Sequence, residues 1–127
     1  GTNRSHLARA ALEAMCYQTK DVLDAMQKDS GLKVKSLKVD GGAVANNLLC
    51  QFQADILCVD VVRPKVIEIT SLGAAYLAGL SVGYWKNSEI IGRSLRKDIG
   101  FKPRMSKSQA HALCKGWQDA IKRTVSK

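Results

Sequence analysis

The sequence contains no long hydrophobic stretch. Within its 127 residues, even the most apolar run, 71–82, is interrupted by Gly, Ser and Tyr, and it falls short of the roughly 20 apolar residues of a membrane span. No apolar segment follows a charged one at the N-terminus, so no signal peptide is expected. The absence of an initiator Met hints at a processed or excised segment. We therefore expect no membrane partner and a cytoplasmic location.

Metal-binding and disulfide patterns are missing as well. The four cysteines stand at 16, 50, 58 and 114, without a Cys-x-x-Cys pair and without a histidine at ligand spacing. This argues against a zinc site and against a disulfide framework, and it is typical of a reducing compartment. Cys16, Cys50 and Cys114 fall on expected helices, where a small buried hydrophobic residue is the better interpretation.

No catalytic constellation is visible. His6 and His111 are far apart in the sequence, and neither lies near a candidate nucleophile. Asp40 stands in a turn, where a helix cap or a link to a neighbouring loop is favoured over general-base work. The motifs G-x-G-x-x-G and G-x-x-x-x-G-K-[ST] are both absent. We therefore assign no catalytic residue and no metal ligand within this chain.

The positive charge is concentrated in the C-terminal third. Residues 1–85 hold 9 basic and 8 acidic side chains, whereas residues 86–127 hold 11 basic and 3 acidic ones. These basic residues are spread singly and without interleaved aromatic residues, as on a solvated helix face. We favour that interpretation over a nucleic-acid surface, which stays the alternative.

The hydrophobic periodicity predicts an α/β chain. Three-and-four spacing predicts a helix over 5–28, and Gly31 stops it. The other expected elements are strands at 37–39 and 59–62, helices at 45–56, 72–82, 87–95 and 106–124, and a linker at 100–103. Alternating strands and helices favour parallel strands joined by helical crossovers. Two strands are few for such a sheet, so the chain reads as part of a domain.

Small residues are frequent along the expected helix 72–82. Gly73, Ala74, Ala75, Ala78, Gly79 and Ser81 would let another backbone approach closely. We expect tight packing of this helix on the sheet.

The stretch Asp40-Gly41-Gly42-Ala43-Val44-Ala45-Asn46-Asn47 lies where the first strand passes into a helix. Without a Cβ, glycine lets a ligand come close to the backbone. The free N–H groups of a first helical turn favour an anion such as phosphate. Asn46 and Asn47 offer carboxamides suited to a ribose or a base edge. By spacing alone, a nucleotide-contacting loop and a plain tight turn both remain open.

Three stretches carry a family resemblance. They are His6-Leu7-Ala8-Arg9-Ala10-Ala11-Leu12-Glu13, then 39–47 followed by 51–57, and then Val62-Arg63-Pro64 through 70–79. In this order they resemble the FGGY carbohydrate kinases, and among them the members that phosphorylate glycerol. The similarity covers nearly all of residues 1–85. It is weaker around Gly116-Trp117, and residues 98–112 depart from the family pattern.

The resemblance implies an actin-like (ribonuclease H-like) ATPase fold built of βαβ units with covering helices. Residues 1–127 would be the C-terminal part of the second kinase domain. Residues 1–85 would form its nucleotide-binding α/β portion, and residues 86–127 a basic helical segment. The implied activity is ATP-dependent phosphorylation of glycerol, with ATP or ADP bound together with Mg. The alternatives are a kinase for another polyol or sugar, and a basic interaction module without catalysis.

The resemblance also implies roles for single residues. Gly42 would approach the nucleotide and Asn46 would contact it through its side chain, while Gly41 and Ala43 shape the approach. The family's phosphate loops, catalytic aspartate, glycerol-binding residues and Mg contacts match nothing in this chain. We therefore expect the chain alone to be inactive, with the remainder of the kinase as its partner and a homo-oligomer as its assembly.

Overall fold

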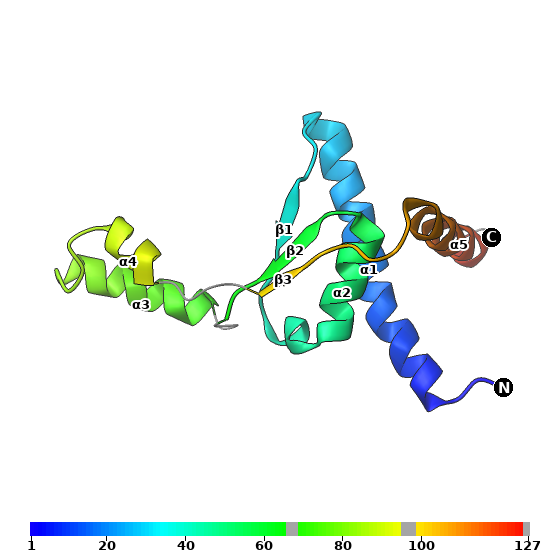
Figure 1. Cartoon of the computed structure of the whole chain (residues 1–127), viewed down its shortest axis with the longest axis horizontal. Helices are drawn as coiled ribbons and strands as arrows, with labels where there is room; N and C mark the ends of the chain where they lie inside the picture. The colour runs from blue at the N-terminus through cyan, green and yellow to red at the C-terminus, as the bar shows by residue number, and fades with distance from the viewer. Residues whose placement is uncertain (66–68, 95–98, 126–127) are drawn as a thin grey trace.

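A computed structural model describes residues 1–65, 69–94 and 99–125, and it shows an α/β chain (Figure 1). In chain order the elements are α1 (Arg4–Ser30), β1 (Ser36–Lys38), the 3-10 turn η1 (Gly42–Ala45), α2 (Asn47–Leu57), β2 (Asp60–Arg63), α3 (Ile69–Ser81), α4 (Ser88–Ser94), β3 (Ile99–Phe101) and α5 (Lys107–Val125). The expected order of elements is confirmed up to α4. Residue 95, the end of the expected helix 87–95, lies outside the described residues.

The long first helix carries its own start and stop signals. The Asn3 side-chain oxygen accepts hydrogen bonds from the backbone N–H groups of Ser5 (3.0 Å) and His6 (3.2 Å). In return, His6 Nδ1 accepts from the Asn3 N–H at 3.2 Å, which completes a capping box. Gly31 ends the helix in the left-handed conformation, with φ +69°. His6 is therefore a helix-capping residue.

In the part of the chain that the structure describes, the sheet has three strands in the order β1-β2-β3. β1 and β2 are parallel, with Leu37 opposite Val61, as the helical crossover predicted. β3 pairs antiparallel with β2, placing Phe101 opposite Val61. The expected linker at 100–103 is therefore wrong in its first half. A three-residue strand with Gly100 at its centre has no alternation to read, and it forms because β2 has a second edge to pair with.

The core lies where α1 and α2 pack against the sheet. Cys16, Cys50 and Val61 are fully buried there, together with Ile56 at 1% exposure. The prediction of buried cysteines is thus confirmed for Cys16 and Cys50, whereas Cys114 is half-buried. All four thiols are free.

The C-terminal helix α5 is attached to α1 through an aromatic pair. The Trp117 ring stacks on Tyr17 with centroids 5.3 Å apart and planes 11° apart. Trp117 Nε1 donates a hydrogen bond to Asp21 Oδ2 at 2.7 Å, so the indole N–H is satisfied at the edge of the core. This contact brings residues 96 positions apart together.

Helices α3 and α4 extend away from the sheet as a separate arm (Figure 1). The small residues of α3 therefore do not serve tight helix–sheet packing, and that expectation is wrong. Gly79 instead receives the ring of Trp85, which also meets Tyr76 edge-on at 5.2 Å. Gly73 has open space where its Cβ would lie. The aromatic residues that follow α3 thus pack back on it.

Across the described residues, no helix combines the length and the apolar character that crossing a membrane requires.

Candidate functional site

The glycine-rich loop lies between the end of β1 and the start of α2. Gly41 adopts φ +88°, a conformation that residues with a Cβ rarely take. A Cβ placed on Gly41 or on Gly42 would meet nothing within 4 Å, so both backbones border open space. Ala43 follows on the η1 turn and is exposed. The loop thus presents bare backbone on an accessible face, as a close-approaching ligand requires.

Asn46 caps α2. Its Oδ1 accepts hydrogen bonds from the N–H groups of Leu48 (2.9 Å) and Leu49 (3.3 Å). Asn46 therefore precedes the helix, whereas both asparagines were predicted on its first turn. Because the cap takes two of the first-turn N–H groups, fewer of them remain for an anion such as phosphate. The Asn46 side chain is exposed, and its carboxamide N–H groups take no part in the cap.

Asn47 and Arg63 join the loop to the sheet. Arg63 Nη2 donates to Asn47 Oδ1 at 2.9 Å, and Nη1 donates to the carbonyl oxygens of Val44 (2.6 Å) and Ala45 (3.1 Å). The Asn47 oxygen is thus engaged within the protein, which favours an anchoring role over the ligand contact that its carboxamide also suited. Sequence reasoning assigned no role to Arg63. The available signal was a lone cation at the end of a β-branched, buried strand.

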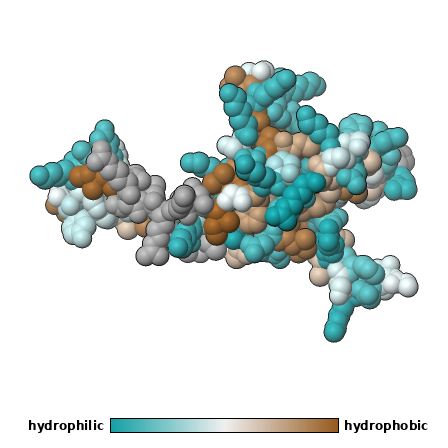
Figure 2. All heavy atoms as spheres, in the orientation of Figure 1, coloured by the Kyte–Doolittle hydropathy of each residue, from teal (hydrophilic) through white to brown (hydrophobic). Residues whose placement is uncertain are grey.

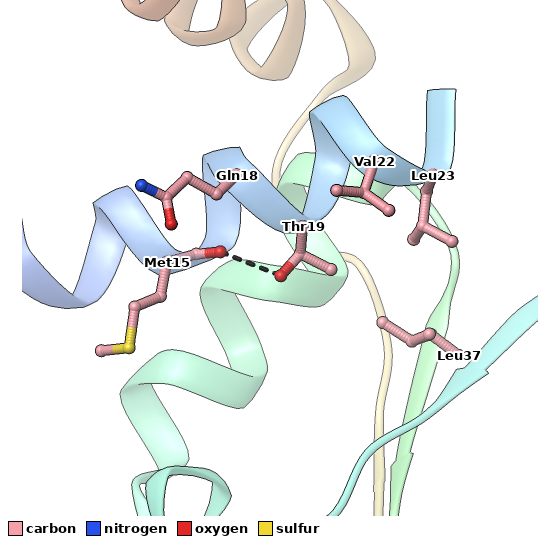
Figure 3. A pocket seen from close by; sticks show the side chains of 6 residues that line it. All are labelled: Met15, Gln18, Thr19, Val22, Leu23 and Leu37. Carbon is pink, nitrogen blue, oxygen red and sulfur yellow. Dashed lines mark hydrogen bonds between the residues drawn. The ribbon is translucent and has the colours of Figure 1, made fainter. Parts of the chain in front are cut away.

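A cavity lies behind the loop, between α1, β1 and α2. It measures about 330 Å³, and Asp40, Ala43 and Val44 line its loop side. A shallower hollow of about 430 Å³ adjoins it, lined by five residues of α1 and by Leu37 of β1 (Figure 3). The Thr19 hydroxyl in this hollow donates to the Met15 carbonyl of its own helix at 2.9 Å. The remaining lining of the hollow is mainly apolar.

The thiols beneath the loop are held protonated. Burial raises the pKa of Cys16 to about 12 and also raises the pKa of Cys50, where the nearby Arg63 guanidinium opposes the effect. Cys16 Sγ donates to the Leu49 carbonyl at 3.5 Å, and Cys50 Sγ donates to the Val44 carbonyl at 3.2 Å. These cysteines therefore pack as structural residues rather than as nucleophiles.

The remaining candidates do not assemble into a site. Asp40 is exposed, and Asn46 rather than Asp40 caps the following helix. His111 is exposed on α5, and His6 serves the α1 cap. The part of the chain that the structure describes holds no group of three His, Cys, Asp or Glu residues able to bind a metal ion.

Two curated relatives match the chain over nearly its whole length. A glycerol kinase of Deinococcus radiodurans is 55% identical over 123 residues, which are 97% of this chain and 25% of the relative. A glycerol kinase of Shewanella sp. (strain ANA-3) is 58% identical over 126 residues, 99% of this chain and 26% of the relative. The chain thus spans about a quarter of the length of these relatives.

Solved structures show the same fold. The crystal structure of Plasmodium falciparum glycerol kinase with ADP superposes with a TM-score of 0.85 at 34% identity, over 100% of this chain and 26% of that one. A xylulose kinase from Lactobacillus acidophilus superposes with a TM-score of 0.67 at 22% identity, over 99% of this chain and 26% of that one, which supports the fold alone. The expected α/β, actin-like kinase fold is thereby confirmed.

The family model of the FGGY carbohydrate kinases, C-terminal domain, matches residues 1–82. This range contains the glycine-rich loop, its Asn46 cap and Arg63. By this match and by the shared fold, the chain belongs to the FGGY family of carbohydrate kinases.

Proposed function

We propose that this chain carries the adenosine-binding loop of an ATP-dependent glycerol kinase. The observation that carries the proposal is the bare backbone at Gly41 and Gly42 beside the exposed side chain of Asn46. The superposition on a glycerol kinase crystallised with ADP supports a nucleotide as the ligand. The identities of 55% and 58% to curated glycerol kinases support glycerol as the phosphoryl acceptor.

Each loop residue then has a distinct task. Gly42 lets the adenosine approach the backbone, and Asn46 contacts it through its side-chain N–H groups, because the Asn46 oxygen already caps α2. Gly41 turns the chain at its positive φ, and Ala43 presents a small side chain at the mouth of the cavity. A carboxamide N–H donates well to a ring nitrogen or a ribose oxygen. The loop thus binds the nucleotide while the reacting phosphates lie elsewhere.

The chemistry of phosphoryl transfer falls outside this chain. The family resemblance implies that the Mg of Mg-ATP is held by residues outside this chain, and the described residues hold no group of three His, Cys, Asp or Glu that could bind a metal ion. The base that accepts the glycerol proton and the glycerol-binding residues belong to the same missing part. Residues 1–127 alone therefore do not phosphorylate glycerol.

The remainder of the kinase covers the exposed apolar side chains of α1 and the free edge of β1. Leu7, Met15, Val22 and Met26 are 41–66% exposed on α1. β1 stands at the edge of the sheet, where another strand can pair. Hydrophobic side chains reach the surface between the charged ones on the visible face (Figure 2). The C-terminal part of the second kinase domain would comprise the α/β portion 1–85 and the basic segment 86–127, in a homo-oligomer that works in the cytoplasm.

The alternatives have weaker support. The xylulose kinase is 22% identical to this chain, which supports a common fold and no substrate. A separate nucleic-acid function for residues 86–127 rests on their net charge alone. We therefore favour glycerol as the substrate over these alternatives.

The test is ATP-dependent phosphorylation of glycerol by the full-length kinase, beside its Asn46→Ala and Asn46→Asp variants. Asp caps a helix as well as Asn does, but its carboxylate offers no N–H group. If Asn46 reads the adenosine, both variants raise the KM for ATP and leave the KM for glycerol unchanged. If only Asn46→Ala raises it, Asn46 acts as a cap alone. Absence of activity on glycerol and on every other polyol or sugar would refute the kinase proposal.

A further inference from the structure

Among the described residues, Arg63 is a buried cation without a carboxylate partner. Its exposure is 8%, although it stands at the end of the sheet. Within residues 1–65, 69–94 and 99–125, the two ion pairs are Arg9–Glu13 and Lys20–Asp24, both on α1. Burying an unpaired guanidinium is costly unless its N–H groups are satisfied by hydrogen bonds. Its donors are here directed to neutral acceptors of one short segment.

All three acceptors of Arg63 lie in the second half of the loop. They are the carbonyl oxygens of Val44 and Ala45 on one side of Asn46, and the side-chain oxygen of Asn47 on the other. Asn46 is thus held between two anchored neighbours. Because hydrogen bonds from a charged donor are stronger than neutral ones, the loop backbone is fixed relative to β2.

The guanidinium is also held against β3. Its central carbon lies 5.2 Å from the centroid of the Phe101 ring. A guanidinium can stack on an aromatic ring while its N–H groups donate in the plane, and a lysine ammonium cannot combine these contacts. The antiparallel pairing of β3 with β2 brings Phe101 to this place, so the arrangement depends on a strand distant in sequence.

We infer that Arg63 is a positioning residue for nucleotide binding: it holds the loop in the shape in which Gly42 and Asn46 meet the adenosine. This inference rests on the proposed function. Arg63 acts through the loop. It fixes the position of the loop relative to β2, and its three hydrogen bonds act on the segment 44–47.

The test compares Arg63→Lys with the full-length wild-type kinase. Lysine keeps the charge and the aliphatic stem but cannot donate to Val44, Ala45 and Asn47 together. We expect the KM for ATP and the Kd for ADP to rise roughly tenfold, the effect of losing about one charge-assisted hydrogen bond. The KM for glycerol should stay within about twofold, since the substitution lies in the nucleotide loop's support. Asn47→Ala removes one of the three bonds and should raise the KM for ATP by about threefold.

Asp55→Ala is the matched control. Asp55 is also 8% exposed and also binds backbone of a neighbouring segment, but at the opposite end of α2. It should lower the thermal midpoint at least as much as Arg63→Lys and leave the KM for ATP unchanged. An unchanged KM for ATP in Arg63→Lys, or an equal rise in Asp55→Ala, would overturn the inference.

Two further results keep the inference separate from the proposed function. If Arg63→Lys does not fold, Asn47→Ala decides, because an unchanged ADP affinity in that variant overturns the positioning role. If the wild-type kinase phosphorylates no polyol or sugar, the proposed function fails, while the ADP affinities of the variants still decide the role of Arg63.

Discussion

At each end of α2 a buried charged side chain binds backbone groups of another segment, and the two charges are opposite. At its N-terminal end the buried Arg63 donates to the carbonyl oxygens of Val44 and Ala45. At its C-terminal end the buried Asp55 accepts from the backbone N–H groups of Arg104 (2.6 Å) and Met105 (3.2 Å). A cation that binds carbonyls stabilises η1 at one end, and a carboxylate that binds N–H groups stabilises the segment before α5 at the other.

What the two ends hold is different. The N-terminal end holds a loop whose Gly41 and Gly42 border open space. The C-terminal end holds the approach to α5, where Gln51 also donates to the Lys102 carbonyl at 2.8 Å. One end can therefore admit a ligand, and the other joins two parts of the fold. A buried charge thus acquires a functional role through the segment that it holds.

The largest effect is expected at the C-terminal end. Asp55→Ala leaves the N–H groups of Arg104 and Met105 without their acceptor, and we expect the free energy of local opening of this segment to fall by about 2 kcal/mol. Hydrogen exchange of these two amides in the full-length kinase measures it. The amides of Leu48 and Leu49 at the other end serve as the reference and should not change. A fall below about 0.5 kcal/mol, or an equal fall at both ends, would show that Asp55 does not hold this segment specifically.

A smaller effect is expected from the thiol under the N-terminal end. Since burial raises the pKa of Cys16 from 9.0 to about 12, the unfolded state loses this proton at lower pH than the folded state does. The stability that the protonated Cys16 thiol contributes is therefore fully present below pH 9, and it is lost as the pH rises toward 12. Between pH 8 and 10 the wild type should lose about 1 kcal/mol more than Cys16→Ala, measured by urea unfolding at each pH. Equal pH slopes would contradict this account.

The smallest effect is expected at Cys58, the C-cap residue of α2. Cys58 ends α2 with φ +55°, a left-handed conformation that disfavours residues with a Cβ. Cys58→Gly relieves this strain and should raise stability by about 0.5 kcal/mol, after the greater freedom of glycine in the unfolded chain is subtracted. The thermal midpoint measures it, with Cys58→Ala as the control that keeps the Cβ. A lower midpoint for Cys58→Gly than for Cys58→Ala would contradict the strain account, because both variants lack the thiol and differ only in the Cβ.

Much of the fold could be predicted, because its signals are local. The helical spacing over 5–28 with Gly31 behind it predicted α1, and the β-branched run before Pro64 predicted β2. The loop 40–47 was identified from its glycines and from the family resemblance. β3 escaped prediction, since three residues around Gly100 carry no period. The packing of α3 on the sheet was predicted wrongly, because small residues allow close packing against many kinds of partner. In the structure the Trp85 ring, and not the sheet, packs against Gly79.

The sequence by itself determined the α/β order, the free cysteines, the glycine turn and the family, because these depend on residue type and short-range spacing. Only the tertiary structure decided what Asn46, Asn47 and Arg63 do. The Asn46 oxygen caps α2, the Asn47 oxygen binds Arg63, and Arg63 reaches back 19 residues to the Val44 carbonyl. A hydrogen bond needs its partners within about 3 Å, and chain folding alone sets that distance between residues far apart in sequence.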